Sequence, residues 1–161
     1  MLNVLWVLLI GYAAGMVLPL YPRQLNTQSL TASICAIVAT CAGIALGLLG
    51  LIAPEPVTLS IASTVPLLTF AIRLDPLAAL FVFTISLVGL AAAIYAVGYV
   101  RHFQGRVSVA ALGALFNGFL LSMTLVVLAD NGLFFLMVWE LMSLASYFLV
   151  VTEHEKADVR P

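Results

Sequence analysis

The chain has 161 residues, of which 64% are hydrophobic and 8% are charged, and its formal net charge is −1. Soluble domains do not have this composition, and the small net charge leaves no basic surface, so we exclude nucleic acid as a partner. Long uncharged runs separated by short charged clusters predict an all-α membrane protein with about five transmembrane helices in the lipid bilayer.

Residues 1–52 are expected to form the first two transmembrane helices. The first span, Met1 to Leu20, ends in an interfacial tyrosine, a helix-breaking proline and a cation at positions 21–23. No basic residue precedes Arg23 and no small-residue cleavage site is clear, so an uncleaved helix is favoured over a signal peptide. The second span covers about Leu30 to Ile52. Small residues spaced four apart on these spans predict close helix packing: Gly11 and Gly15, then Gly43 and Gly47.

Residues 53–75 are expected to form an extracytoplasmic loop that contains a small β-hairpin. The uncharged piece from Pro56 to Ile72 is short for a span, and apolar residues alternate at 57, 59 and 61 and again at 70, 72 and 74, as they do in strands. A further buried helix is the alternative for this segment. Asp75 and Pro76 then predict the start of the third span, with Asp75 as a helix cap rather than a chemical group.

Residues 76–152 are expected to supply three more spans, at about Pro76 to Val97, Ser108 to Leu128 and Asn131 to Thr152. In the fourth span Asn117 and Thr124 lie seven residues apart on one face, and a hydrogen bond to a neighbouring helix is favoured over a role in transport. Residues 153–161 are expected to be a cytoplasmic tail.

Neither the tail nor the cysteines predict a metal or redox site. Glu153, His154 and Glu155 are consecutive, so they cannot share one helix face. Cys35 and Cys41 lie six residues apart in an apolar run without a nearby histidine, and we interpret them as packing residues.

The distribution of cations predicts the orientation in the cell inner membrane. With five spans, Arg73 lies on one side of the membrane and the other five of the 6 Lys and Arg residues lie on the opposite side. The positive-inside rule makes the five-cation side cytoplasmic, so the N-terminus is expected outside and the C-terminus inside.

The fifth span carries one carboxylate, Glu140, near its middle. An acidic group at the centre of a spanning helix costs about 2.5 to 3.5 kcal/mol, and such groups are usually functional. Ser143 and Tyr147 follow at three and seven residues, so they share a helix face with it. We take Glu140 as the candidate proton-relay residue, with Ser143, Tyr147, Trp139 and Asn117 as supporting residues.

Every Lys and Arg lies in a predicted loop or in the tail, so these helices supply no cation to Glu140. A buried carboxyl group without a cation favours its protonated form, and a cation on helices outside this chain is the other solution. Both solutions point to proton handling, whereas a hydrogen-bonded packing element is the structural alternative. A side chain that pointed at acyl tails or reached headgroup water would contradict the proton-carrier interpretation.

Four features occur in order along the chain: Leu74-Asp75-x-Leu77, the pair Tyr95 and Tyr99, the turn Leu128-Ala129-Asp130-Asn131, and Trp139-Glu140 within a helix. In this combination the sequence resembles the N-terminal part of the antiporter-like subunits of respiratory complex I and of membrane-bound hydrogenases. Within that family it is most similar to the hydrogenase-4 component B and formate hydrogenlyase subunit 3 type.

The resemblance implies a subunit without a cofactor of its own that moves protons while a peripheral arm carries out redox chemistry. Its implied partners are other membrane subunits of a hydrogenase or NADH dehydrogenase type complex. Glu140 matches the family's fifth-helix glutamate, which pairs with a lysine on a later helix. Family members continue well beyond the position of Pro161, so the resemblance implies a truncated or split product whose remaining helices lie on another chain.

A structural membrane bundle, or an assembly fragment without transport activity of its own, is the second hypothesis. In that case Glu140 docks a partner helix. An independent enzyme is poorly supported, because the sequence has no cysteine cluster, phosphate-binding loop or nucleophile arrangement.

Overall fold

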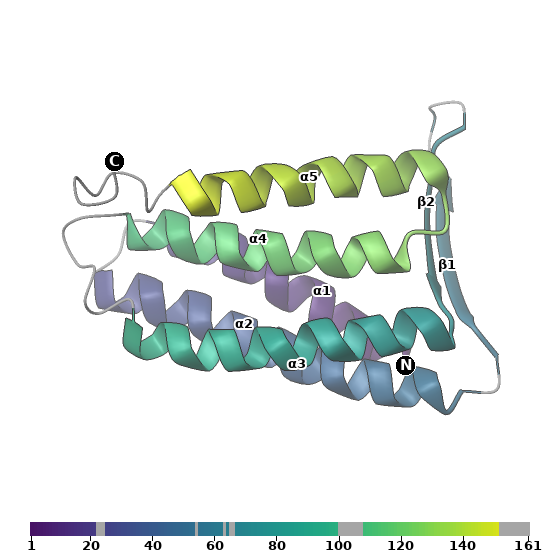
Figure 1. The fold of residues 1–161 in the computed structure, drawn as a ribbon, viewed down its shortest axis with the longest axis horizontal. Coiled ribbons are helices and arrows are strands. Elements are labelled where there is room, and N and C mark those ends of the chain that lie inside the picture. Colours follow the sequence, from purple (N-terminus) through teal and green to yellow (C-terminus); the bar gives the residue numbers. More distant parts are fainter. Residues whose placement is uncertain (22–24, 54, 63, 65–66, 100–107, 152–161) are drawn as a thin grey trace, which may run out of the picture.

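Five helices cross the length of the molecule in the computed structural model, which describes residues 1–21, 25–53, 55–62, 64, 67–99 and 108–151. All five are long and apolar enough to span a membrane, which confirms the predicted number of spans (Figure 1). They are α1 (Leu2–Val17), extended by the short 3-10 helix η1 (Leu18–Leu20), then α2 (Leu25–Leu51), α3 (Pro76–Tyr99), α4 (Val109–Leu128) and α5 (Gly132–Val151).

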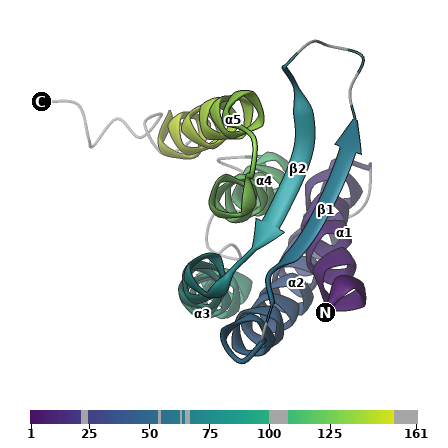
Figure 2. The same cartoon turned by 90° about the vertical axis from the view of Figure 1, so that its right-hand side faces the viewer.

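A two-stranded antiparallel hairpin joins α2 to α3 and confirms the predicted β-structure in this loop. It consists of β1 (Val57–Ala62) and β2 (Thr69–Leu74), with Val57 opposite Leu74 and Leu59 opposite Ile72. These two pairs line a small hollow against α1 and α2, so the apolar alternation places one face of the hairpin on the helices. Figure 2 shows the hairpin lying across one end of the bundle, which we call the hairpin end.

The helices form a bundle in which α2 packs between α1 and α3, and α4 packs against α1, α2 and α5. Helix α5 lies at the edge and contacts α4 and strand β2 (Figures 1 and 2). The other elements therefore cover much less of α5 than of α2.

Small residues let the helices approach closely, as the glycine spacing predicts. A Cβ atom added to Gly11 would lie 2.9 Å from the Cβ of Ala39, and one added to Gly47 would lie 2.6 Å from the Cβ of Phe83. Van der Waals packing at short range is the main attraction between helices in lipid, where apolar side chains gain little by leaving the solvent. These contacts therefore fix α1 and α3 on α2.

Helix α2 begins at Leu25, earlier than the expected start near Leu30. Its first turns are polar, and the side-chain amide of Gln28 donates to the backbone oxygen of Tyr21 at 3.3 Å. Hydropathy marks only the apolar part of a helix, whereas backbone hydrogen bonding continues into such a polar turn. The helix is thus longer than the span that it contributes.

Candidate functional site

The backbone of strand β2 and the turn before α5 fix where α5 begins. The amide of Asp130 donates to the backbone oxygen of Ala71 at 2.9 Å, and the side-chain amide of Asn131 donates to the backbone oxygen of Leu67 at 3.1 Å. Residues from two distant parts of the chain are thereby joined at the hairpin end, which sets the depth of α5 relative to the other helices.

Asn131 also caps α5. Its side-chain oxygen accepts hydrogen bonds from the backbone amides of Leu133 and Phe134, both at 3.1 Å. The ring of Phe134 meets that of Phe70 in β2 edge to face, with centroids 5.5 Å apart. Polar capping and aromatic packing together orient the first turn of the helix.

One face of α5 packs on the bundle, and the opposite face is open. The buried residues of α5 are Phe134, Val138 and Ala145, which lie along one side of the helix. Glu140, Ser143 and Tyr147 are exposed, as is Trp139. The candidate stripe therefore exists, but it faces away from the other four helices.

Glu140 lies at about 12 Å along the helix axis from Gly132, near the middle of α5, at a rise of about 1.5 Å per residue. Its side chain is exposed, and it makes no hydrogen bond or ion pair with the described residues. The expectation that an intramembrane carboxylate faces the interior of its bundle is not met by these five helices. Within these five helices alone, Glu140 therefore meets the condition that contradicts a proton carrier, and a relay at this position requires further helices that cover this face.

The supporting residues on α5 do not form a hydrogen-bonded chain to Glu140. The hydroxyl of Ser143 donates to the backbone oxygen of Trp139 at 3.1 Å, one turn back on its own helix. The ring of Tyr147 packs edge to face on that of Phe148, with centroids 5.5 Å apart. Ser143 and Tyr147 thus share a helix face with the Glu140 carboxylate, and among the described residues neither forms a hydrogen bond with it.

Asn117 lies in the core of the bundle, away from the α5 stripe. Its side chain is fully buried, and its amide donates to the backbone oxygens of Ala32 at 3.2 Å and Gly113 at 2.9 Å. The bond to Ala32 joins α4 to α2, as expected for a polar residue that links helices. Thr124 instead bonds within its own helix, to the backbone oxygen of Leu120 at 2.8 Å. Asn117 is therefore a packing residue and does not belong to the α5 stripe.

Other polar side chains are buried that the sequence analysis did not single out. Tyr12 in α1, Thr40 in α2 and Ser86 in α3 are each fully buried. A Cβ atom on Gly43 would collide with the hydroxyl of Ser86, so the glycine makes room for a polar group on the facing helix. The sequence feature that could have identified these three residues is an isolated hydroxyl group in an otherwise apolar span, and each of the three lies at a contact between helices.

Within the described residues no group of three or more His, Cys, Asp or Glu side chains could hold a metal ion. Cys35 and Cys41 are free thiols, and Cys41 is exposed. The predicted cytoplasmic tail, with Glu153, His154 and Glu155, lies outside the described residues.

A protein-family model matches part of this chain. Residues 63–108, which include the second strand, α3 and the segment that follows, match the model described as NADH-ubiquinone oxidoreductase (complex I), chain 5 N-terminus.

Three curated relatives extend the match. The chain is 35% identical over 88 residues to hydrogenase-4 component B of Escherichia coli, which covers 55% of this chain and 13% of the relative. It is 42% identical over 83 residues to F420H2 dehydrogenase subunit L of Methanosarcina mazei (52% and 12%), and 38% identical over 81 residues to NADH-quinone oxidoreductase subunit L of Buchnera aphidicola (50% and 13%).

The matched part of the chain thus spans only about an eighth of the length of each of these three relatives. Five apolar helices, a hairpin that ties α5 to the bundle, and sequence similarity from the hairpin onward agree with one another. The chain is a homologue of the antiporter-like membrane subunits of complex I and of related hydrogenase and dehydrogenase complexes.

Proposed function

We propose that this chain is the N-terminal portion of a proton-translocating membrane subunit in a hydrogenase or NADH:quinone oxidoreductase type complex, with Glu140 as its proton-relay residue. The observation that supports this proposal is the place of Glu140, a carboxylate halfway along a spanning helix, on a face that the other described elements leave open.

The cost of that position argues for a covering structure. A carboxylate turned toward acyl chains at mid-depth costs about 2.5 to 3.5 kcal/mol, which is a large part of the stability of an ordinary domain. Helices packed on the open face of α5 would remove Glu140 from lipid. We propose that other membrane subunits of the complex, or the remaining helices of the antiporter-like fold on another chain, supply them.

A lysine on such a covering helix would let Glu140 respond to movement. At an effective dielectric constant near 20, two charges about 4 Å apart interact by about 4 kcal/mol, which corresponds to about three powers of ten in proton affinity. Separating the pair would therefore cause Glu140 to take up a proton, and restoring the pair would release it. This cycle is what a relay needs to couple proton movement to a change elsewhere in the complex.

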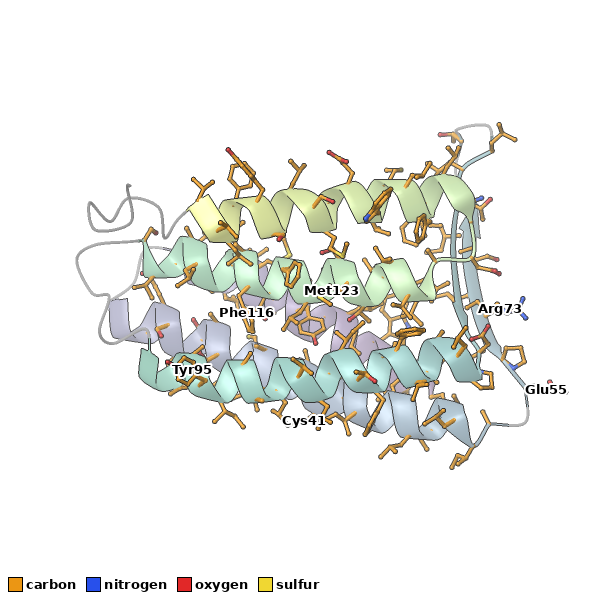
Figure 3. All side chains as sticks on the ribbon, viewed as in Figure 1. Cys41, Glu55, Arg73, Tyr95, Phe116 and Met123 are labelled. Carbon is orange, nitrogen blue, oxygen red and sulfur yellow. The ribbon has the colours of Figure 1, made fainter. Side chains whose placement is uncertain are left out.

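Glu140→Gln in the assembled complex tests the relay. Glutamine keeps the size of the side chain but cannot exchange a proton, so we expect proton pumping into vesicles to fall at least about tenfold. Redox activity with an artificial acceptor and co-purification of the partner subunits should stay normal. Glu55→Gln is the matched control, because Glu55 is an exposed carboxylate at the hairpin end, outside the helices (Figure 3). Unchanged pumping in Glu140→Gln would contradict the proposal.

A docking role for Glu140 is the second candidate, and the bonding of Ser143 favours it. The Ser143 hydroxyl is used within α5, so the described residues offer no chain of hydrogen bonds that leads a proton to Glu140. If Glu140 only docks a partner helix, Glu140→Gln releases the partner subunits, while the complex that still assembles pumps normally. The two readouts thus separate the candidates.

A further inference from the structure

A groove of about 360 Å³ opens at the hairpin end, between α3 on one side and α4 and α5 on the other. It is separate from the Glu140 stripe and has no part in the proposed relay. Its lining comes from the end of β2 and from the helix ends nearby: Arg73, Asp75, Leu77, Ala78, Phe81, Val126, Val127, Ala129, Asp130 and Phe135.

The wall of the groove that runs along the helices is apolar and exposed. Leu77 is 63% exposed, Phe81 is 50% exposed and Phe135 is 39% exposed. These residues lie in the first turns of α3 and α5, where the spans begin. A hydrocarbon chain that lies between α3 and α5 would cover all three side chains.

Charged groups of both signs stand at the end of the groove nearest the hairpin. The side chain of Arg73 is 48% exposed, and its Nε lies 3.9 Å from the Asp75 carboxylate, too far for a hydrogen bond. Figure 3 shows Arg73 directed away from the helices at the hairpin end. Its guanidinium group therefore keeps donors for another anion.

The two carboxylates at this end differ in their availability. Asp75 caps α3, because its Oδ1 accepts the backbone amide of Ala78 at 2.8 Å. The Asp130 side chain is exposed and makes no hydrogen bond or ion pair with the described residues, while its backbone amide is bonded to β2. The groove thus presents one cation and one free carboxylate next to an apolar wall.

We propose that this groove binds phosphatidylethanolamine from the surrounding bilayer. The phosphate pairs with Arg73, the primary ammonium donates to Asp130, and an acyl chain lies against Leu77, Phe81 and Phe135. Phosphatidylcholine has no N–H donor for Asp130. Phosphatidylglycerol brings an anion without a cation and meets two carboxylates. The charges lie at the level where a span begins, which is where a lipid headgroup lies and where the middle of a partner helix does not.

Photocrosslinking tests the site. The full chain is reconstituted in nanodiscs of phosphatidylcholine that contain a trace of phosphatidylethanolamine with a photoactivatable group on its acyl chain. We expect labelling concentrated on peptides that contain Leu77 to Phe81 and Phe135, and we expect unlabelled phosphatidylethanolamine to compete at least about fivefold better than phosphatidylglycerol or added phosphatidylcholine. Equal competition by the three lipids would overturn the proposal. Labelling spread evenly over all helices, which indicates contact with bulk lipid, would also overturn it.

Variants separate headgroup recognition from simple contact with lipid. Asp130→Asn should lower groove labelling about fivefold, as expected for loss of one partly exposed charge-assisted hydrogen bond, and Arg73→Gln should act in the same direction. Asp130→Asn keeps the backbone bond to β2, so the fold is retained. Glu55→Gln is the control for charge at this end, and Leu87→Ala, an exposed α3 residue outside the groove, is the control for Phe81→Ala. Equal effects of Asp130→Asn and Glu55→Gln would overturn the assignment.

Discussion

Two polar side chains within the spans, Asn117 and Glu140, lie in opposite environments. Asn117 is fully buried and bonds to the backbone of α2, whereas Glu140 is exposed and without a partner in the described residues. The hydrogen bond from its side-chain amide to Ala32 gives Asn117 a structural role as a link between α4 and α2, while its buried side-chain oxygen has no hydrogen-bond partner among the described residues. Glu140 has no comparable bond to another helix among the described residues, and this contrast is why we propose the relay role for Glu140.

We expect Asn117→Ala to lower the stability of the bundle by about 1 kcal/mol, because hydrogen bonds between transmembrane helices contribute about that much. Thermal unfolding in detergent measures the change. Thr124→Val is the control, since Thr124 bonds only to its own helix and its loss leaves no bond between helices broken. Equal losses in the two variants would show that the Ala32 bond does not hold α4 to α2.

The depth of the candidate site could be predicted from sequence, but its direction could not. Counting residues from Gly132 places Glu140 near mid-span, whichever way the helix is turned. The sequence does not show which face of α5 packs on the bundle, because outside the Glu140 stripe the helix is apolar all round, and its packed residues Phe134, Val138 and Ala145 resemble the lipid-facing ones. In a membrane, composition does not distinguish a face that contacts protein from one that contacts acyl chains.

At the scale of elements, the contact between α2 and α3 depends on the small size of Gly47. A Cβ atom at this position would lie 2.6 Å from the Cβ of Phe83 and 2.9 Å from the backbone oxygen of Ala79. The contact with the oxygen of Ala79 involves the helix backbone, which cannot change its conformation as a side chain can by adopting another rotamer. The two helices would have to move apart to accept even one methyl group.

We therefore expect Gly47→Ala to destabilise the protein by about 1 to 3 kcal/mol through overpacking. Gly98→Ala is the matched control, because Gly98 is also helical and a Cβ atom added there meets nothing within 4 Å. That variant should be neutral or slightly stabilising, since alanine is the better helix former. Chemical unfolding in mixed micelles compares the two. A neutral Gly47→Ala would mean that the α2–α3 contact can relax.

The hairpin shows which elements a sequence can reveal. Alternating apolar residues in β1 and β2 predicted it because one strand face rests on α1 and α2, so its pattern reports a real difference between two sides. The bonds from Asp130 to Ala71 in β2 and from the Asn131 side chain to Leu67 could not be predicted, because they join groups about 60 residues apart in sequence and both acceptors are backbone oxygens, which any residue type supplies.

At the scale of the whole molecule, the distribution of cations predicts orientation. Arg73 is the only Lys or Arg among the described residues, and it lies at the hairpin end. The other five of the 6 Lys and Arg residues belong to sequence segments on the opposite side of the predicted spans, so the positive-inside rule predicts that the hairpin end lies outside the cell. We expect Glu55→Cys, in a background with Cys35 and Cys41 replaced by Ala, to react with a membrane-impermeant maleimide in intact cells.

Ser108→Cys, at the start of α4 on the opposite end, should react only after the membrane is opened. Each variant is the control for the other, because both positions are exposed. The reverse pattern of labelling would place the N-terminus in the cytoplasm and would invert the side from which the proposed relay receives protons.

The bonds between β2 and the turn before α5 also bear on biogenesis. Residues 57–74 leave the ribosome before α4 and α5 have been made, so the hairpin can reach its final side of the bilayer while the rest of the chain is still being synthesised. When the turn at Asp130 and Asn131 reaches the same side, the backbone oxygens of Ala71 and Leu67 are already in place to accept its hydrogen bonds. The hairpin thus forms before α5 and provides the hydrogen-bond acceptors that position it. If the hairpin were not translocated, α5 would insert into the bilayer without the bonds that fix its depth.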